Sequence, residues 1–320
     1  MQRVGLDLAN GFIKVCAEGQ SPLVYENRLK QLSEAELSFM GGSTDTTYEV
    51  HGELYQVSND GISSGGRDSD RYLTEQYLVE CLIALSRVAT EPDVVLCIGL
   101  PGRDYQNKEL RQSIINLLKG CYEVKVDGVP KIINIEEVKV IYEPLGTLLT
   151  VIYNSNLAVI GDRDQYTYLT IDIGYGTTDL LGTKQGVRPT KLACADVGMM
   201  DCMSHYLTLI NNRMIAEGDN ARFNQEDVTL LFKSEIKKYG RIYNFEAELD
   251  RAKDYTAKLV ASRIKQCGVN LNDYDRVIYT GGGSLALKDY LNKPHNARMT
   301  QKAQTGNSEG YLRYLQIRGV

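Results

Sequence analysis

The pattern of apolar and polar positions predicts an α/β chain whose two halves follow the same plan. In the first half, strands are expected where apolar residues alternate with polar ones or run continuously: residues 3–17 as strand–turn–strand, 23–25, 47–55 as a hairpin turning at His51-Gly52, 94–100, both sides of Asp127-Gly128, and 138–142. Helices are expected where apolar residues recur at helical spacing, over 72–86, 109–119 and about 143–153. Residues 58–70, rich in glycine, serine and aspartate, are expected to form a mobile loop.

The second half repeats this order of elements. Strands are expected at 167–173, 178–184, 191–196 and 276–279. Helices are expected at 199–216, 225–232 and 246–266, and again after the glycines at 281–283, where Ser284 is expected to cap the helix. A short helix over about 308–317 is expected to return to the first half. The repetition favours two related domains.

Two segments half a chain apart share one turn chemistry. In the second half, an apolar strand delivers Asp172 to a turn containing Gly174 and Gly176, and the next strand opens with Thr177, Thr178 and Asp179. The segment from Val4 to Val15 aligns with it, placing Asp7 on Asp172, Ala9 on Gly174, Gly11 on Gly176 and Lys14 on Asp179. Each segment alone could be an ordinary hairpin, because turns favour glycine and aspartate. As a pair, they predict two loops whose backbone N–H groups grip an anion, with carboxylates holding a hydrated Mg²⁺.

Five motifs, in this order, resemble those of the actin/Hsp70/sugar-kinase superfamily, and most closely the ParM/StbA-type plasmid-segregation actin-like ATPases. They are phosphate-1 at Asp7–Lys14, connect-1 at Tyr142–Gly146, phosphate-2 at Asp172–Asp179, the adenosine motif at Tyr279–Leu285 and a degraded connect-2 at Asn307–Tyr311. Leu100-Pro101 and Tyr48–Tyr55 are further similarities, and the resemblance covers nearly the whole chain. Two positions depart from the family, which usually has Ser or Thr at Asn10 and a small or amide residue at Glu309.

The resemblance implies an actin-like α/β fold. Two related domains, each a mixed sheet flanked by helices, would hold a nucleotide in the cleft between them. Domain I would comprise residues 1–148, with a small subdomain at about 30–65 and a C-terminal helix, about 305–320, returning to it. Domain II would comprise residues 149–304, with a subdomain at about 185–267.

The resemblance also implies the site residues. Glu143 and Asp172 would be catalytic, with Glu143 orienting the attacking water, although a carboxylate there also suits a helix N-terminus. Asp7 and Asp172 would hold Mg²⁺, through water molecules. The other nucleotide-binding residues implied are Asn10, Gly11, Phe12, Lys14, Gly174, Tyr175, Gly176, Thr177, Thr178, Asp196, Gly198, Gly281, Gly282, Gly283 and Ser284.

The implied function is an ATPase that forms nucleotide-dependent filaments. ATP or GTP with Mg²⁺ would drive self-assembly, hydrolysis would destabilise the filament, and a DNA-bound, ParR-like adaptor would connect it to plasmid DNA. One alternative is a small-molecule kinase of the sugar-kinase type with the same fold. Another is an actin-like scaffold that binds nucleotide but hardly hydrolyses it. A chaperone of the Hsp70 type is excluded, because the chain has no room for a peptide-binding domain.

Composition limits the partners. The net charge of −5 gives no overall positive field, so direct binding to nucleic acid is not expected. The seven cysteines include no C-x-x-C pair, which favours reduced thiols, and the three histidines show no metal-ligand spacing. The first residues enter a strand directly, and no apolar run reaches membrane-spanning length. A cytoplasmic protein without a membrane partner is therefore expected.

Overall fold

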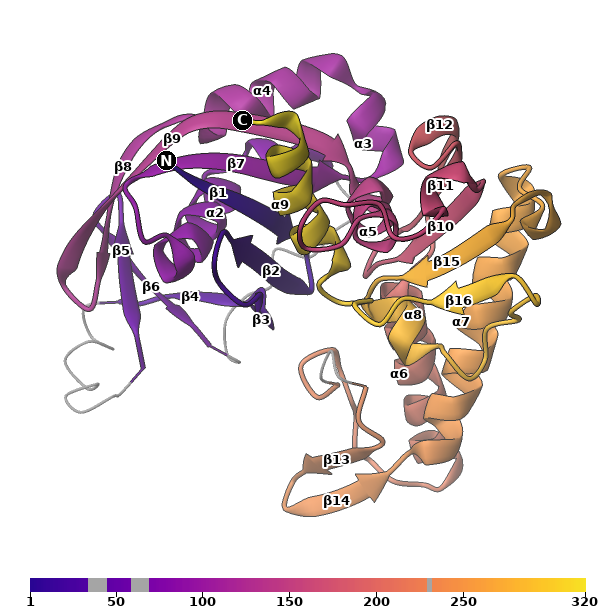
Figure 1. Ribbon diagram of the computed structural model, residues 1–320. Helices are drawn as coiled ribbons and strands as arrows, with labels where there is room; N and C mark the ends of the chain where they lie inside the picture. The colour runs from indigo at the N-terminus through magenta and orange to yellow at the C-terminus, as the bar shows by residue number, and fades with distance from the viewer. Residues whose placement is uncertain (34–44, 59–68, 229–231) are drawn as a thin grey trace.

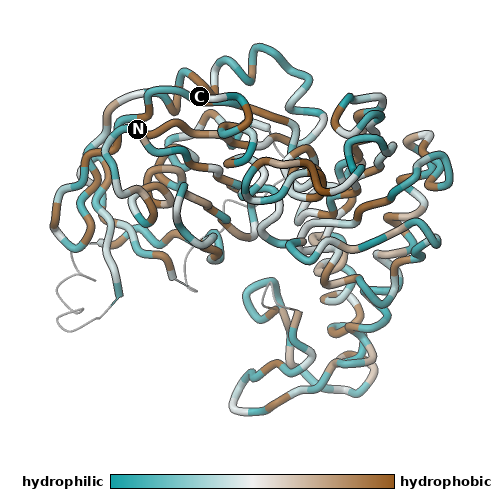
Figure 2. The backbone as a smooth tube through the Cα atoms, in the orientation of Figure 1, coloured by the Kyte–Doolittle hydropathy of each residue, from teal (hydrophilic) through white to brown (hydrophobic). Residues whose placement is uncertain are grey.

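The computed structural model describes residues 1–33, 45–58, 69–228 and 232–320. Two α/β domains lie beside each other, and the helices α5 (Glu143–Ile152) and α9 (Gly306–Arg318) lie between their sheets (Figure 1). Apolar residues concentrate in the strands of both sheets (Figure 2). Within the described residues, no helix has the length and apolar character needed to cross a membrane.

The first domain contains a nine-stranded sheet in the order β3-β2-β1-β7-β9-β8-β5-β6-β4. Its strands are β1 (Gln2–Leu8), β2 (Phe12–Ala17), β3 (Leu23–Glu26), β4 (Leu29–Gln31), β5 (Thr47–Val50), β6 (Glu53–Val57), β7 (Asp93–Leu100), β8 (Gly120–Val126) and β9 (Val129–Tyr142). Its helices, besides the 3-10 turn η1 (Ser69–Leu73), are α2 (Glu75–Val88), α3 (Gly102–Gln106) and α4 (Lys108–Leu118).

The central strand β7 explains why this region is continuously apolar. Val94, Leu96 and Ile98 join the core that includes α2 and α4. The intervening Val95 and Cys97 join a separate core with Tyr311 and Leu315 of α9. Because side chains alternate between the two faces of a strand, both faces of β7 are buried.

The second domain contains a five-stranded sheet in the order β12-β11-β10-β15-β16. Its strands are β10 (Tyr168–Ile173), β11 (Thr178–Lys184), β12 (Arg188–Ala195), β15 (Arg276–Thr280) and β16 (Ala297–Met299). The helices α6 (Met199–Ala216) and α7 (Glu246–Gln266) cover one face, and a separate hairpin, β13 (Glu235–Lys238) with β14 (Arg241–Asn244), lies beyond them. The short elements are η2 (Arg163–Gln165), η3 (Leu271–Asp273) and α8 (Gly282–Ala286).

The two sheets share one topology, as the repeated sequence plan predicts. The order β3-β2-β1-β7-β9 in the first corresponds to β12-β11-β10-β15-β16 in the second. In each, an antiparallel hairpin pairs in parallel with a later strand, β1 with β7 and β10 with β15. Two related mixed sheets flanked by helices are the predicted actin-like fold, which is therefore confirmed.

Several local predictions were wrong. The strand after Gly128 and the strand predicted at 138–142 are one element, β9, with an irregularity opposite Val94/Val95. Residues 225–228 form turns rather than the start of a helix, because Asn224 and Asp227 exchange hydrogen bonds between side chain and backbone. Gly281 caps α8, and Ser284 lies inside that helix, its hydroxyl bonded to the Thr280 carbonyl.

Other predictions are confirmed or lie outside the described residues. The helices at 199–216 and 246–266 match α6 and α7, and α9 packs on the first domain. The hairpin at His51-Gly52 is β5–β6. The mobile loop expected at 58–70 and part of the subdomain expected at about 30–65 fall on residues 34–44 and 59–68, which are not described. The domain limits at 148 and 149 stay a prediction.

Candidate functional site

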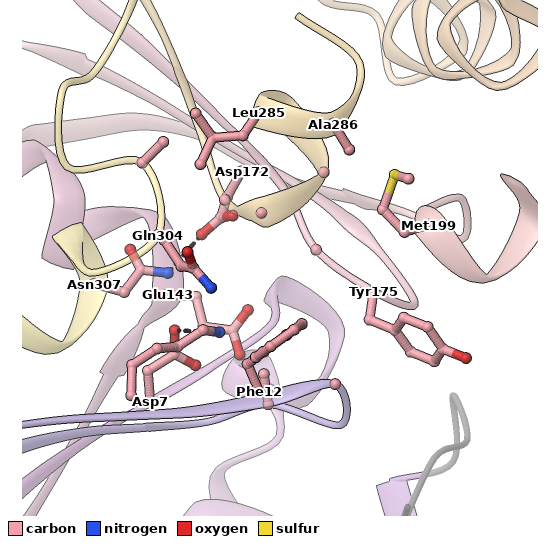
Figure 3. Close-up of a pocket in the computed structure, with 18 of the residues that line it drawn as sticks. Asp7, Phe12, Glu143, Asp172, Tyr175, Met199, Leu285, Ala286, Gln304 and Asn307 are labelled. Atoms are coloured by element: carbon pink, nitrogen blue, oxygen red, sulfur yellow. Dashed lines mark hydrogen bonds and ion pairs between the residues drawn. The ribbon is translucent and has the colours of Figure 1, made fainter. Parts of the chain in front are cut away.

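A cavity of about 350 Å³ opens between the two domains. It is lined by both matching hairpins, by the N-terminus of α5 and by the segment that leads into α9. The lining residues are Asp7, Ala9, Gly11, Phe12, Lys14, Glu143, Asp172, Gly174, Tyr175, Met199, Phe232, Gly281, Gly282, Gly283, Leu285, Ala286, Ala303, Gln304 and Asn307. In Figure 3, the side chains of Asp7, Glu143 and Asp172 point into the same space, with Asn307 beside Asp172.

Asp7 and Asp172 occupy the same place in their respective hairpins. Asp7 pairs with Lys14 across β1–β2, and Asp172 pairs with Asp179 across β10–β11. Both carboxylates are nearly buried, at 6% and 5% exposure. Lys14 Nζ lies 3.1 Å from Asp7 Oδ2, whereas Asn307 Nδ2 donates to Asp172 Oδ2 at 2.6 Å.

Burial raises the pKa of three carboxyl groups near the cavity, those of Glu143, Asp172 and Asp179. Burial raises the pKa of Asp172 to about 7, although the hydrogen bond from Asn307 opposes the shift. Burial also raises the pKa of Asp179 to about 6. The pKa of Glu143 is held well above its usual range by burial, then by Asp179, Asp7 and Asp172. Three acidic groups, Asp7, Glu143 and Asp172, therefore line the cavity together with one ammonium group, that of Lys14, and the site favours an added cation.

Glycines allow the strand ends to approach one another closely. Gly281 has a φ of 85°, and a methyl group there would overlap the Asp172 carboxylate and the Ile173 carbonyl. A methyl group on Gly198 would lie 2.5 Å from the Tyr175 carbonyl, where α6 begins. Met199 N and Met200 N donate to the carbonyls of Gly174 and Tyr175 at 3.1 and 2.8 Å, which fixes the second loop on α6.

The base of the cavity is closed by contacts between α5 and α9. A methyl group on Gly310 would overlap the Gly146 carbonyl, so the two helices cross with their backbones touching. Beside the crossing, Thr147 Oγ1 lies 2.9 Å from Thr280 Oγ1 and donates to Asn307 Oδ1 at 2.8 Å. Asn307 therefore connects α5 to the Asp172 carboxylate.

Family models match both halves of the chain. The N-terminal domain of the actin-like proteins matches residues 5–146, and the C-terminal domain of the archaeal MreB-like actin homologues matches residues 170–293. The chain belongs to the actin-like proteins.

Solved structures agree with this assignment over the full length. The apo pSK41 ParM protein is 20% identical, with 99% of this chain and 98% of that one covered at a TM-score of 0.69. A 15-stranded ParM filament from Clostridium botulinum is 16% identical, with 99% of each chain covered at 0.78. The archaeal actin homologue Ta0583 in complex with ADP is 18% identical, with 99% and 100% covered at 0.76. At these identities the likeness shows the actin-like fold. No curated protein sequence matches the chain.

The cavity of this actin-like protein contains most of the residues that the sequence predicts. Its lining includes the three acidic residues Asp7, Glu143 and Asp172, together with Gly11, Phe12, Lys14, Gly174, Tyr175, Gly281, Gly282 and Gly283. These come from four separate stretches of sequence. Their nucleotide-binding and catalytic roles stay predictions.

Seven predicted residues do not line the cavity. The Thr178 hydroxyl is buried and donates to the Val197 carbonyl, and Thr177 donates to Asp179. Asn10 accepts a hydrogen bond from Arg71, which also binds the buried Glu80. The other four are Gly176, Asp196, Gly198 and Ser284. Asp196 is exposed near Arg103. Gly198 caps α6, and Ser284 lies within α8.

The sequence interpretation missed eight lining residues. They are Ala9, Met199, Phe232, Leu285, Ala286, Ala303, Gln304 and Asn307. Six are apolar; Ala9 and Leu285 lie inside the phosphate-1 and adenosine motifs, whereas Met199, Phe232, Ala286 and Ala303 carry no sequence signal that distinguishes a pocket wall from a core. Asn307 belongs to the connect-2 segment, and an amide two residues before Glu309 at a helix start could have identified it.

Proposed function

We propose that this chain is an actin-like ATPase of the ParM type, whose filaments assemble with bound nucleotide and segregate plasmid DNA through an adaptor. The observation that carries the proposal is the meeting of Asp7 and Asp172, from two hairpins of identical register, at one cavity between the domains. A triphosphate held there would touch both domains at once, so its presence favours the closed arrangement.

The phosphates would lie between the two hairpin loops. The backbone around Gly11 would offer N–H groups, whereas the Gly174 N–H already donates to the Thr177 carbonyl at 2.9 Å. The Lys14 ammonium would neutralise phosphate charge. Gly281, Gly282 and Gly283 would let the backbone pass close to the nucleoside, with Leu285 and Met199 as apolar walls. The ADP complex of the archaeal relative supports a nucleotide in this fold.

The acidic groups fit a hydrated Mg²⁺. Carboxylate oxygens are the ligands that this ion prefers, and Asp7 and Asp172 face one cavity from opposite domains. No group of three metal-ligating side chains occurs among the described residues, so water and phosphate would have to supply most of the ligands. When bound, Mg²⁺ would neutralise charge on the phosphates.

Glu143 would orient the attacking water. It begins α5 at the inner end of the cavity, and its carboxylate makes no hydrogen bond with any residue that the structure describes. Phosphoryl transfer to water needs positioning and charge stabilisation more than covalent help. A carboxylate that accepts a proton from water can supply the positioning. Loss of the γ-phosphate would remove contacts between the domains and loosen the filament.

The ParM filament among the structural relatives supports assembly into a polymer. The net charge of −5 supports attachment to DNA through a separate, ParR-like protein. A sugar-type kinase is less favoured, because several solved structures that resemble this chain over its full length are actin homologues.

Sedimentation and light scattering test this proposal. The pure protein is compared with Mg-ATP, Mg-GTP, Mg-ADP and a slowly hydrolysed triphosphate, and phosphate release is followed in parallel. We expect triphosphate-dependent pelleting that reverses as phosphate is released and persists with the analogue. Asp7→Asn/Asp172→Asn, which keeps the side-chain shapes, is the matched control and should not pellet. Sugar-stimulated turnover without pelleting would contradict the proposal.

A further inference from the structure

Tyr311 of α9 carries a buried hydroxyl beside the acidic cavity. The residue is fully buried, and its hydroxyl has no hydrogen-bond partner in the described part of the chain. The ring packs with Val95, Cys97, Ile141 and Leu315. Phenylalanine would make the same apolar contacts, so packing explains the ring and does not explain the hydroxyl.

The hydroxyl and the Glu143 side chain meet at Gly99, in the penultimate position of β7. A methyl group built on Gly99 would overlap the Tyr311 hydroxyl and lie 2.9 Å from Cγ of Glu143. The Tyr311 hydroxyl is a hydrogen-bond donor without an acceptor. The Glu143 side chain is a carboxylate to which no described residue donates. A donor and an acceptor that are both unpaired lie on either side of one glycine.

Helix geometry connects Tyr311 to a residue already at the site. Asn307 and Tyr311 are four residues apart on α9, so their side chains lie on the same face of the helix. Asn307 donates to Asp172. The same face of α9 therefore presents one donor to Asp172 and a second donor toward Glu143.

We propose that Tyr311 is a positioning residue whose hydroxyl donates to the Glu143 carboxylate, directly or through one water, when the cavity closes on nucleotide. This inference rests on the proposed ATPase function. The bond would hold the Glu143 carboxylate in one orientation toward the attacking water. It would leave nucleotide contacts unchanged, because Tyr311 does not line the cavity.

Tyr311→Phe removes the hydroxyl and keeps the ring. We expect kcat for phosphate release to fall by about tenfold or more with KM for the nucleotide within about twofold, since small misplacements of a reacting group slow catalysis strongly. The melting temperature should stay the same or rise, because an unpaired buried hydroxyl is lost. Wild-type kcat in this variant would overturn the proposal. A raised KM would point to Asp7 or Asp172, the other carboxylates that act on the Tyr311 hydroxyl, and would also overturn it.

Tyr206→Phe is the matched control. Tyr206 is also fully buried, but it belongs to the second domain, where its hydroxyl donates to the Lys233 carbonyl at 3.2 Å. This variant should lower the melting temperature slightly and leave kcat unchanged. Equal losses of kcat in both variants would show a general effect of removing a buried hydroxyl, contrary to the proposal.

A double-mutant cycle and a structure complete the test. If Tyr311 acts through Glu143, Tyr311→Phe should slow the Glu143→Gln variant little further, whereas multiplying losses would overturn the proposal. In a crystal structure with a slowly hydrolysed triphosphate, we expect the Tyr311 hydroxyl within hydrogen-bond distance of Glu143 or of a water bound to it. A hydroxyl bonded to neither would overturn the inference even if the wild type hydrolyses ATP. Absence of hydrolysis by the wild type with this contact present would instead contradict the proposed function alone.

Discussion

The hairpins β1–β2 and β10–β11 have the same register and opposite electrostatics. In the first, Asp7 faces Lys14, and the two charges form an ion pair. In the second, Asp172 faces Asp179, and burial raises the pKa of both acids, with repulsion from Asp7 and Asp179 adding to the shift of Asp172. The duplicated framework thus keeps one carboxylate in each copy while changing its cross-strand partner.

This difference assigns separate tasks to the two copies. The first hairpin brings a positive charge to the cavity. In the second, Asp179 accepts from Gly102 N at 2.6 Å, and Gly102 belongs to the other domain. Asp179 therefore joins the domains instead of facing the cavity. The second copy supplies the contact between the domains, and the first supplies charge for the ligand.

The largest expected effect separates hydrolysis from nucleotide binding by the two hairpins. Glu143→Ala leaves both hairpins intact, so the variant should bind ATP normally while phosphate release slows by about 100- to 10,000-fold. Nucleotide affinity and single-turnover phosphate release measure the two properties independently. Wild-type turnover would remove Glu143 from its assigned role.

The next effect concerns the helix crossing that makes the hairpins face each other. Gly310→Ala places a methyl group on the Gly146 carbonyl and should destabilise the nucleotide-free protein by about 2–3 kcal/mol. Gly282→Ala is the control, since no atom lies within 4 Å of its added methyl group. Thermal unfolding measures both. Similar melting temperatures for the two variants would contradict this prediction, because they would show that α5 and α9 can move apart at the crossing without loss of stability.

Exchanging the cross-strand partners sharpens the comparison itself. Lys14→Met removes the only ammonium group lining the cavity among the described residues and should weaken triphosphate binding by about tenfold. Asp179→Asn can still accept from Gly102 N and should change binding by less than about threefold. Titration calorimetry with the slowly hydrolysed triphosphate compares them. Equal losses of triphosphate affinity in the two variants would mean that the hairpins β1–β2 and β10–β11 do not have separate tasks.

The smallest effect is on stability against pH. Asp172 and Asp179 have pKa values of about 7 and about 6 in the folded protein, above the usual value of 3.8. The folded state therefore binds protons that the unfolded chain has released, and stability from these groups is lost as pH rises from about 4 to 7. Without nucleotide or divalent cation, the melting temperature should fall by a few degrees over this range. Asp179→Asn should reduce the slope, and a slope identical to that of the wild type would contradict this interpretation.

The sequence predicted those parts of the molecule that local pattern determines. The helices α6 and α7 have the predicted limits, because each is a long segment in which apolar residues recur at helical spacing. The sequence divides β9 into two strands because two polar residues, the half-buried Asn134 and the exposed Glu136, interrupt its apolar pattern at a sheet irregularity. Nothing local indicates that this strand continues.

The same distinction applies to the site. The aligned aspartates and glycines identified the cavity from either side. The sequence could not show that Asn10 turns toward Arg71, because this contact joins residues 61 positions apart. Nor could it show that Asn307 supports Asp172, 135 positions away. Roles that depend on such distant partners need the folded arrangement.

The placement of α9 has a consequence during synthesis. This helix completes one face of the first sheet, yet it follows α5 only after the entire second domain has been made. At about 5–20 residues per second, the ribosome needs about 10 to 30 s for that stretch. Until then the first sheet exposes its β7 face, and the Asn307 amide cannot reach its carboxylate. Nascent chains are thus barred from completing the cavity, and from joining any polymer that depends on it, before the whole chain has emerged.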